Sequence, residues 1–587
     1  MLALFLTSLL MTTSPAPAPE WRTPFETGGG NTTATYAECV AYYQKLAGAY
    51  PKQLHLATAG PTDSGQPLHE VVLSPDGDTD PASIRRKNRR ILFIQNGIHP
   101  GEPEGIDASM MLARDLMQQK SLQKLLSNVT VVIVPVYNID GMLNRNATTR
   151  VNQNGPAEYG FRGNARHLDL NRDYIKQESR NARSFAALFQ KWQPDVFVET
   201  HTSNGADYQY TMTLIATQHS KLAPALGTYL QGQLLPALYK GMDKKKSPMT
   251  PYVDFDGQTP ESGLRAFLET PRYSTGYAAL FNTIGFMPET HMLKAFAPRV
   301  HATYDFLKTV LETVGQQSAA LAAARAAAAS AMATQAVFPL TWKLDDSQHE
   351  TVQFRGYEGK LKPSEVSGQP RLYYDRAAPF TRQVKYFNTF RPSTTAQRPT
   401  AYLIPKAWAE VVDILRRNGA TLEPLAKDVT VPVQAYYFED FKTTPRPFEG
   451  HYVHSQVQLR TATETATFHQ GDFVVYVSDT APARYLLETL EPQATDSFFA
   501  WGFFDSVLQQ KEHFSDYVFE DVAADLLRRD AALRERLEKL KKDNPAFAAN
   551  GPAQLEWVYL NSAYHEAGHN RYPVARWLGQ GRVDEAR

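Results

Sequence analysis

The sequence predicts an α/β protein whose first part has a mixed, largely parallel sheet flanked by helices, with a second C-terminal α+β domain. Two near-continuous apolar runs, ILFIQNG at 91–97 and VTVVIVPVYN at 129–138, are typical of strands buried on both faces. A helical segment lies between them, so strand and helix alternate as in a parallel β-α-β unit. From residue 337 this alternation gives way to short strand-like runs separated by turn residues.

The amino-acid composition argues against several classes of function. The chain has 587 residues, with 61 Lys and Arg against 61 Asp and Glu, so its formal net charge is zero. This balance argues against a protein that binds nucleic acid through bulk charge, because phosphate binding needs a basic face. Hydrophobic residues make up 43% of the chain, which is enough for full cores. The single cysteine, Cys39, excludes an internal disulfide and any multi-cysteine metal site.

The first 19 residues have features of a signal peptide. Leu2–Met11 is an apolar run too short to span a bilayer, and Ala16-Pro17-Ala18 offers a small-residue cleavage pattern. We therefore expect a secreted or periplasmic protein. No other stretch approaches 18 uninterrupted apolar residues, so we expect a soluble mature protein with no transmembrane segment.

The predicted first domain covers residues 20–315 and contains several helices and strands in alternation. Apolar spacing predicts helices over Tyr36–Tyr50, from Pro103 to Met117, over Arg180–Trp192 and over Leu222–Tyr239. Two more buried strands are predicted over Asp195–Thr200 and over 282–289.

Two further regions follow the first domain. The alanine-rich run at 316–336 predicts a helical connector, and residues 337–587 predict an accessory α+β domain. Helices are expected in that domain over Ala407–Asn418 and Asp516–Lys542.

The ends of two predicted strands carry residues suited to binding a metal. His99-Pro100-Gly101-Glu102 follows the strand at 91–97, and its Pro-Gly turn can aim an imidazole and a carboxylate at one ion. His201 follows the strand at 195–200 and offers a third ligand at the carboxyl end of another strand. Clefts in open α/β sheets form at such ends.

Two more segments carry candidate functional groups. In Asp169-Leu170-Asn171-Arg172, the Arg172 guanidinium offers a bidentate fork for a carboxylate, with Asn171 as a neighbouring donor. Glu289 adds a carboxylate at the end of the strand over 282–289.

This order of segments resembles the zinc carboxypeptidase family of A/B-like metallopeptidases, over about residues 35–310. The resemblance implies a metallocarboxypeptidase that cleaves the C-terminal peptide bond of a peptide with a free terminal carboxylate, with one Zn²⁺ per chain. By position, it implies the following roles: His99, Glu102 and His201 as zinc ligands; Asp169 orienting a ligand histidine; Glu289 as general base for a zinc-activated water; Arg162, in GFRGN, as oxyanion donor; and Asn171 and Arg172 holding the terminal carboxylate.

Some of these positions have rivals in the sequence. Arg145 and Arg150 compete with Arg162 for the oxyanion role, and Glu269 competes with Glu289 for the base. Either Tyr273 or Tyr277 could be the tyrosine that assists catalysis in the family.

A second motif, His565-Glu566-Ala567-Gly568-His569, matches His-Glu-x-x-His. That motif binds zinc only where both histidines lie one turn apart on a stable helix. Gly568 lies inside it and Pro573 follows closely, so we predict a loop with surface histidines.

Two alternative functions compete with the carboxypeptidase. A related zinc amidohydrolase would use the same ligands on a peptidoglycan stem peptide or an N-acyl amino acid, and it would have no use for Arg172 if its substrate lacked a terminal carboxylate. A binding protein with a degenerate hydrolase domain would hold no zinc.

Overall fold

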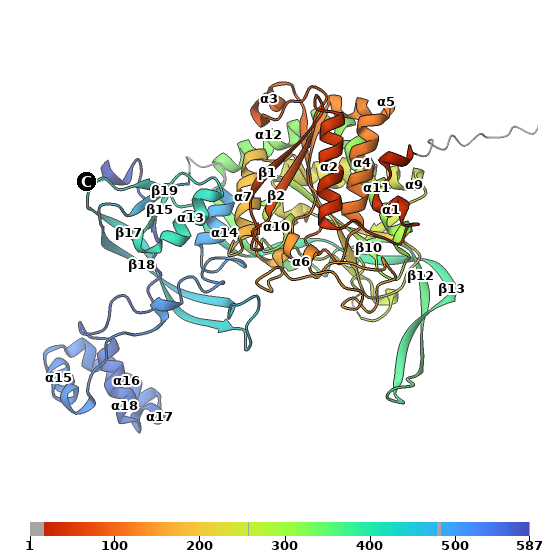
Figure 1. Ribbon diagram of the computed structural model, residues 1–587. Coiled ribbons are helices and arrows are strands. Elements are labelled where there is room, and N and C mark those ends of the chain that lie inside the picture. The colour runs from red at the N-terminus through yellow and green to blue at the C-terminus, as the bar shows by residue number, and fades with distance from the viewer. Residues whose placement is uncertain (1–16, 256, 478–482, 586–587) are drawn as a thin grey trace, which may run out of the picture. The chain divides into compact units, whose positions relative to one another are not determined.

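The computed structural model describes residues 17–255, 257–477 and 483–585, so residues 1–16 of the predicted signal peptide lie outside the described residues. The chain forms two compact units (Figure 1). The first contains the described residues up to Gln397, together with the short segments 417–420 and 483–487, and the second contains the remaining described residues. Among the described residues, no helix is both long and apolar enough to cross a membrane.

A nine-stranded mixed sheet forms the centre of the first unit. Its strands run in the order β1 (Leu54–Pro61), β2 (Pro67–Leu73), β4 (Val129–Val134), β3 (Arg90–Gln95), β5 (Val196–Glu199), β10 (Ile284–His291), β7 (Met212–Ala216) and β8 (Met249–Pro251), with β6 (His201–Ser203) also paired to β10. The pairs around β3, β5 and β10 are parallel, except for β10 with β7. The predicted largely parallel sheet is therefore confirmed.

Helices cover both faces of this sheet, and the central strands present apolar side chains to both faces. On β3, Leu92 and Ile94 point into a core that they share with α4 (Glu104–Gln118) and α11 (Phe296–Gln316). Phe93 points to the opposite face, where its ring lies 6.1 Å from that of Phe185 on α7 (Arg180–Trp192). Successive strand side chains alternate between faces, so a strand buried on both sides reads as an unbroken apolar run.

The helix predicted over Leu222–Tyr239 is interrupted. It forms α8 (Pro224–Tyr229), one π-helical turn over Leu230–Leu234, and α9 (Leu235–Lys244). Pro236 accounts for the break, because proline lacks a backbone N–H and its ring clashes with the carbonyl four residues earlier.

The first unit extends further along the chain than the change of composition suggested. The alanine-rich run forms α12 (Ser318–Thr334), which buries Leu321 and Ala328 in the main core. The long hairpin of β12 (Glu350–Pro363) and β13 (Pro370–Phe387) pairs with β9 (Leu264–Arg265). Contacts therefore group residues 337–397 with the first unit, whereas the composition placed a boundary at 337.

The second unit contains a separate antiparallel sheet and a helical bundle. The strand order is β16 (Glu423–Pro424), β19 (Phe473–Tyr476), β15 (Ala401–Ile404), β20 (Ala575–Trp577), β17 (Val429–Thr443) and β18 (His454–Phe468). The helix expected over Asp516–Lys542 divides into α15 (Asp516–Arg529) and α16 (Ala531–Asp543). Asp530 ends the first helix and caps the second, since its carboxylate accepts from the Leu533 backbone N–H.

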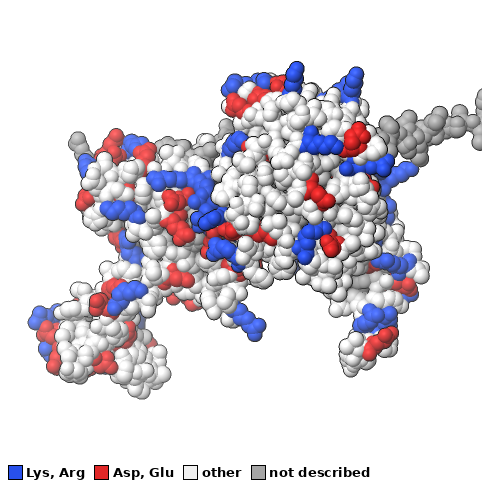
Figure 2. All heavy atoms as spheres, in the orientation of Figure 1, with Lys and Arg blue, Asp and Glu red and all other residues white. Residues whose placement is uncertain are grey.

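Charged side chains of both signs are interspersed on the face of the molecule shown in Figure 2. That distribution accords with the zero net charge of the sequence. That the protein does not bind nucleic acid remains a prediction.

We expect Asp107 on α4 to make the stability of the protein depend on pH. The side chain is fully buried, and burial raises its pKa from 3.8 to about 7. Between these values the folded state holds a proton that the unfolded chain has released. The free energy of unfolding therefore falls by about 1.4 kcal/mol for each pH unit as the pH rises through this window.

Asp107→Asn removes this titration. We expect its melting temperature to exceed that of the wild type at pH 8, with a much smaller difference at pH 5, in thermal unfolding measured across this range. A difference that stays constant from pH 5 to pH 8 would contradict the assignment.

Candidate metal centre and active site

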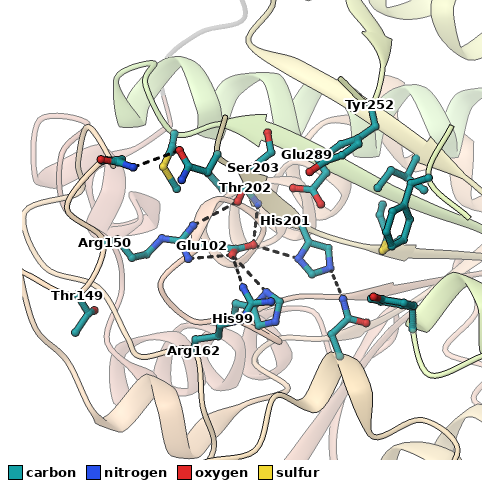
Figure 3. A pocket seen from close by; sticks show the side chains of 18 of the residues that line it. His99, Glu102, Thr149, Arg150, Arg162, His201, Thr202, Ser203, Tyr252 and Glu289 are labelled. Atoms are coloured by element: carbon teal, nitrogen blue, oxygen red, sulfur yellow. Dashed lines mark hydrogen bonds and ion pairs between the residues drawn. The ribbon is translucent and has the colours of Figure 1, made fainter. Parts of the chain in front are cut away.

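Three side chains that are distant in the sequence meet in a cavity of about 470 Å³ in the first unit (Figure 3). The ligand atoms of His99, Glu102 and His201 lie within 4.8 Å of one another, and all three residues are buried. The Nδ1 atom of His99 lies 3.3 Å from Oε1 of Glu102. The Nδ1 atom of His201 lies 3.1 Å from Oε2 of the same carboxylate.

The fold brings these residues together at the carboxyl ends of neighbouring strands. A turn after β3 carries His99 and Glu102, and the Glu102 N–H donates to the His99 carbonyl over 2.8 Å. Gly97 enters this turn with φ of +63°, a conformation that favours glycine. His201 begins β6, directly after β5, and pairs in parallel register with Glu289 on β10.

Each histidine ring contacts a second carboxylate through its Nε2 atom, on the side away from Glu102. The His99 Nε2 atom lies 2.9 Å from Oδ1 of Asp169, and the His201 Nε2 atom lies 2.8 Å from Oε2 of Glu199. These contacts fix the ring orientations and leave each Nδ1 facing Glu102. Asp169, which the sequence suggested as the residue that orients a ligand histidine, makes one of these contacts, whereas Glu199 was missed. Its signal was a carboxylate at the end of the buried strand VFVE, where a charged group needs a partner.

The residues fit a divalent metal ion. The Nδ1 atom of His99 is buried and faces Glu102, yet it makes no hydrogen bond to the described residues, which is rare for a buried polar atom. Two imidazole nitrogens and one carboxylate form a donor set typical of zinc. His99, Glu102 and His201 could therefore hold the ion.

Opposing charges set the ionisation of this cluster. Burial disfavours the charged Glu102 carboxylate, but Arg150 and His99 hold its pKa well below the usual range. Burial likewise disfavours a charged His201 ring, yet Glu199 and Glu102 raise its pKa.

Two of the three candidate arginines lie in the cavity. Arg150 Nη1 donates to Oε1 of Glu102 over 3.0 Å. Arg162 Nη2 lies 2.8 Å from Oδ2 of Asp169, and its Nη1 lies 3.6 Å from Oε1 of Glu102. The third candidate, Arg145, donates instead to the carbonyls of Ala34 and Glu158 and does not line the cavity.

Of the two candidate bases, only Glu289 lines the cavity. Burial raises its pKa above the usual range, and the neighbouring Glu102 carboxylate adds to this effect. Glu269 is fully buried elsewhere, where it accepts from the Gln218 N–H over 2.7 Å and lies 3.9 Å from the Lys221 ammonium.

Arg172 and Asn171 also line the cavity, on a short 3-10 turn capped by Asp169. The Arg172 guanidinium stacks over the Tyr273 ring, 4.3 Å from its centroid. The Asn171 amide is engaged with the protein, since its Oδ1 accepts from the Ser274 N–H and its Nδ2 lies 3.3 Å from the His201 Nε2. Arg172 is the better placed of the two to receive an anion.

The two candidate tyrosines are separated by the fold. Tyr273 lines the cavity, whereas Tyr277 is fully buried and donates to Oδ1 of Asn418 over 2.6 Å. Tyr252, which the sequence gave no reason to select, also lines the cavity. Figure 3 shows it on the same side of the site as Glu289.

A buried ion pair supports the metal ligands from outside the cavity. Glu104, at the start of α4, pairs with Arg299 on α11 and accepts from the Thr202 hydroxyl over 2.7 Å. The Thr202 N–H in turn donates to Oε2 of Glu102 over 2.8 Å. Arg299 also donates to the carbonyls of Asn154 and Gly155, in the loop that carries Arg150.

The second histidine motif lies in turns over residues 561–570 rather than in a helix. The His565 Nε2 atom lies 3.4 Å from the His569 Nδ1 atom. Within the described ranges, no third ligand-type side chain joins this pair. The motif therefore lacks the helical geometry that its chemistry requires.

Known proteins match the chain over the region that contains the site. The family model described as zinc carboxypeptidase matches residues 39–234, which include the three candidate ligands, Arg162 and Arg172. The chain is 23% identical over 474 residues to carboxypeptidase 2 of Trichophyton rubrum, covering 75% of this chain and 78% of that protein. It is also 23% identical over 444 residues to carboxypeptidase 2 of Trichophyton tonsurans, covering 70% and 73%.

A metallo-carboxypeptidase from Burkholderia cenocepacia is among the similar solved structures. It has 16% sequence identity and a TM-score of 0.37, over 48% of this chain and 70% of that chain. The family match and the curated relatives agree with the order of motifs in the sequence. Residues 39–234 therefore match the zinc carboxypeptidase family, and the longer similarity to proteins named carboxypeptidase 2 supports a metallocarboxypeptidase enzyme.

Proposed function

We propose that the protein is a zinc-dependent metallocarboxypeptidase that hydrolyses the C-terminal peptide bond of peptides. One observation carries this proposal: the His99, Glu102 and His201 cluster shares its cavity with a carboxylate, Glu289, and a guanidinium, Arg172. The cavity thus combines metal ligands, a base and an anion anchor. We further propose that the cluster holds one zinc ion per chain.

A bound zinc ion would supply Lewis acidity, which polarises a carbonyl oxygen and makes water acidic near pH 7. Glu289 accepts the proton of the attacking water and later delivers it to the leaving amine. Its buried position beside other carboxylates favours this role, since the raised pKa strengthens it as a base.

Two arginine side chains serve the oxygen-bearing groups on either side of the scissile bond, which are the terminal carboxylate and the carbonyl of the preceding residue. Arg172 binds the terminal carboxylate, with Asn171 fixing the surrounding turn, so that the last peptide bond lies next to Glu289. Arg162 stabilises the negative charge that develops on the carbonyl oxygen. Its half-exposed side chain leaves donors available towards the cavity, whereas Arg150 is held by Glu102, Gln153 and the Thr202 carbonyl.

Arg172→Ala tests the proposal. We expect kcat/KM for a blocked dipeptide with a free carboxylate to fall about 10²-fold, because charge-assisted hydrogen bonds of this kind are worth roughly 1.5–3 kcal/mol. Hydrolysis of the matching C-terminal amide should be slow and nearly unchanged. Arg166→Ala is a suitable control, since this arginine donates to the Glu178 carbonyl and does not line the cavity.

Equal losses on the acid and the amide would contradict the carboxypeptidase proposal and favour the zinc amidohydrolase. A wild-type protein that contains no zinc and hydrolyses neither substrate would favour a binding protein with a degenerate domain.

We also propose export to the periplasm or the medium, on the apolar run Leu2–Met11 and the small residues before Pro19. N-terminal sequencing of the mature protein would test the predicted cleavage.

A further inference from the structure

The first unit contains a second cavity, of about 370 Å³, apart from the proposed catalytic site. It is lined by residues of β7, β8, α9 and the base of the β12–β13 hairpin, and the two cavities share no described lining residue. Ile215 of β7 lines the catalytic cavity, whereas its neighbours Leu214 and Ala216 line the second cavity. Because successive strand side chains point to opposite faces, the two cavities lie on opposite sides of β7. The volume is typical of small-molecule sites, which enclose roughly 300–1,000 Å³.

The inner part of the second cavity is apolar. Leu214 and Ala216 on β7 and Met249 on β8 line it from the sheet, and Leu235 lines it from α9. Leu214 and Met249 are buried members of the main core. A ligand that fills this space therefore needs an apolar body, since a strongly hydrated group would lose its water without compensation.

A carboxylate lies at the rim of the second cavity. The exposed Glu350, at the start of β12, pairs directly with the half-buried Tyr386 of β13 in the antiparallel register. Directly opposed residues project from the same face of a hairpin, so both side chains face the cavity that they line. Gln231, in the π-helical turn before α9, donates to Oε1 of Glu350 over 2.8 Å. This bond ties the carboxylate to the opposite wall of the cavity.

Three tyrosine rings line the cavity: Tyr210, Tyr239 and Tyr386. Burial raises the pKa of the Tyr239 and Tyr386 hydroxyls, and the nearby Glu350 adds to this effect, so both rings stay neutral at physiological pH. The face of a neutral phenol ring attracts a cation. Arg355 already lies over the Tyr210 ring, 5.5 Å from its centroid. Tyr239 and Tyr386 are therefore the rings that would meet a cation in the cavity.

The charge of the lining favours a cation over an anion. Among the described residues that line the cavity, Glu350 is the one carboxylate, and none is a lysine or an arginine. His219 also lines the cavity, but burial lowers the pKa of its imidazole, which is therefore mostly neutral at pH 7. A cation would find a counter-charge beside two aromatic rings, whereas an anion would meet only repulsion.

We infer that the second cavity binds a small organic ammonium ion. The apolar body of the ligand occupies the inner part, and its ammonium group lies at the rim, between the Glu350 carboxylate and the rings of Tyr239 and Tyr386. This inference does not depend on the proposed peptidase function, because the two cavities are separate.

Titration calorimetry with phenethylamine and phenethyl alcohol tests the inference on the full-length, metal-loaded protein. The two compounds share an apolar body and differ in charge. We expect the amine to bind at least about 5-fold more tightly than the alcohol, because it adds a charge pair and cation–π contacts. Equal affinities would overturn the inference, and so would the absence of saturable binding of the amine at millimolar concentration.

Glu350→Gln tests the role of the carboxylate. Glutamine keeps an oxygen to which Gln231 can donate, so we expect the variant to fold. The affinity for phenethylamine should fall about 5-fold, while the affinity for phenethyl alcohol should not change. Glu365→Gln is the matched control, since this exposed carboxylate lies in the turn of the same hairpin and does not line the cavity.

Glu289→Gln distinguishes the second cavity from the catalytic one, which also contains carboxylates. We expect this variant to bind phenethylamine as the wild type does. Weaker binding by Glu289→Gln, together with unchanged binding by Glu350→Gln, would place the amine in the catalytic cavity and overturn the inference.

Ala216→Leu tests the position of the apolar body. The added carbon atoms would occupy part of the inner space, so both compounds should bind at least about 5-fold more weakly. A melting curve checks that the variant is folded. Unchanged affinity for phenethylamine in the folded variant would show that the ligand binds elsewhere.

Discussion

Glu289→Gln is expected to lower kcat by about 10³-fold, while the protein still folds and binds metal. Glutamine has almost the same shape as glutamate but cannot accept a proton at neutral pH, and general acid–base catalysis typically contributes about 10²–10⁴-fold. KM should change little, because the substrate is anchored through Arg172. Steady-state kinetics, metal analysis and a melting curve on the same preparation would separate a chemical defect from a structural one.

Glu269→Gln is the matched control for this experiment. Glu269 was the rival base in the sequence, yet it is buried against Gln218 and Lys221 and does not line the cavity. We expect kcat close to the wild-type value. If Glu269→Gln loses catalysis and Glu289→Gln retains it, the assignment of the base is wrong.

His99→Ala is expected to abolish stoichiometric metal binding and to lower kcat by at least about 10³-fold. The remaining ligands, Glu102 and His201, leave the ion with two protein donors, and zinc sites of this kind need three. Metal content per chain after dialysis should fall from about one to near zero, and chelation of the wild type should remove activity that added zinc restores.

The His565→Ala/His569→Ala double variant separates the two histidine motifs. These residues lie in turns and lack a third described ligand, so the variant should keep its zinc and its kcat. Loss of the metal from this variant, with His99→Ala unaffected, would place the ion in the second unit and refute the site proposed above.

The sequence alone was enough to predict that His99, Glu102 and His201 come together, because the signal for each residue lies next to it in the chain. Each of His99, Glu102 and His201 follows a short apolar run, and the carboxyl ends of parallel strands meet at one edge of the sheet. The rest of the cavity depends on long-range packing. Tyr252 and Phe267 come from an irregular segment whose path no periodicity describes, so nothing in the sequence indicated that it returns to the site.

The domain organisation shows a similar division between local and long-range information. The strands over 337–397 were predicted as strands, but their attachment to the first unit depends on long-range contacts. One of these is the pairing of β13 with β9, a two-residue strand without a sequence signature. The break at Asp530 was also missed. Aspartate favours helix caps, but the charged run around this residue continues the helical pattern on both sides of it.

The Glu104–Arg299 pair has a consequence for how inactive variants should be interpreted. Arg299 reaches both the loop before Gly155 and, through Glu104 and Thr202, the carboxylate of Glu102. Loss of either partner would leave an uncompensated buried charge, which typically costs about 3–5 kcal/mol. A genetic screen scored on activity alone would therefore mistake Arg299 for a participant in the chemistry, although it lies behind the site. Measuring how much intact protein accumulates in the cell would expose the error.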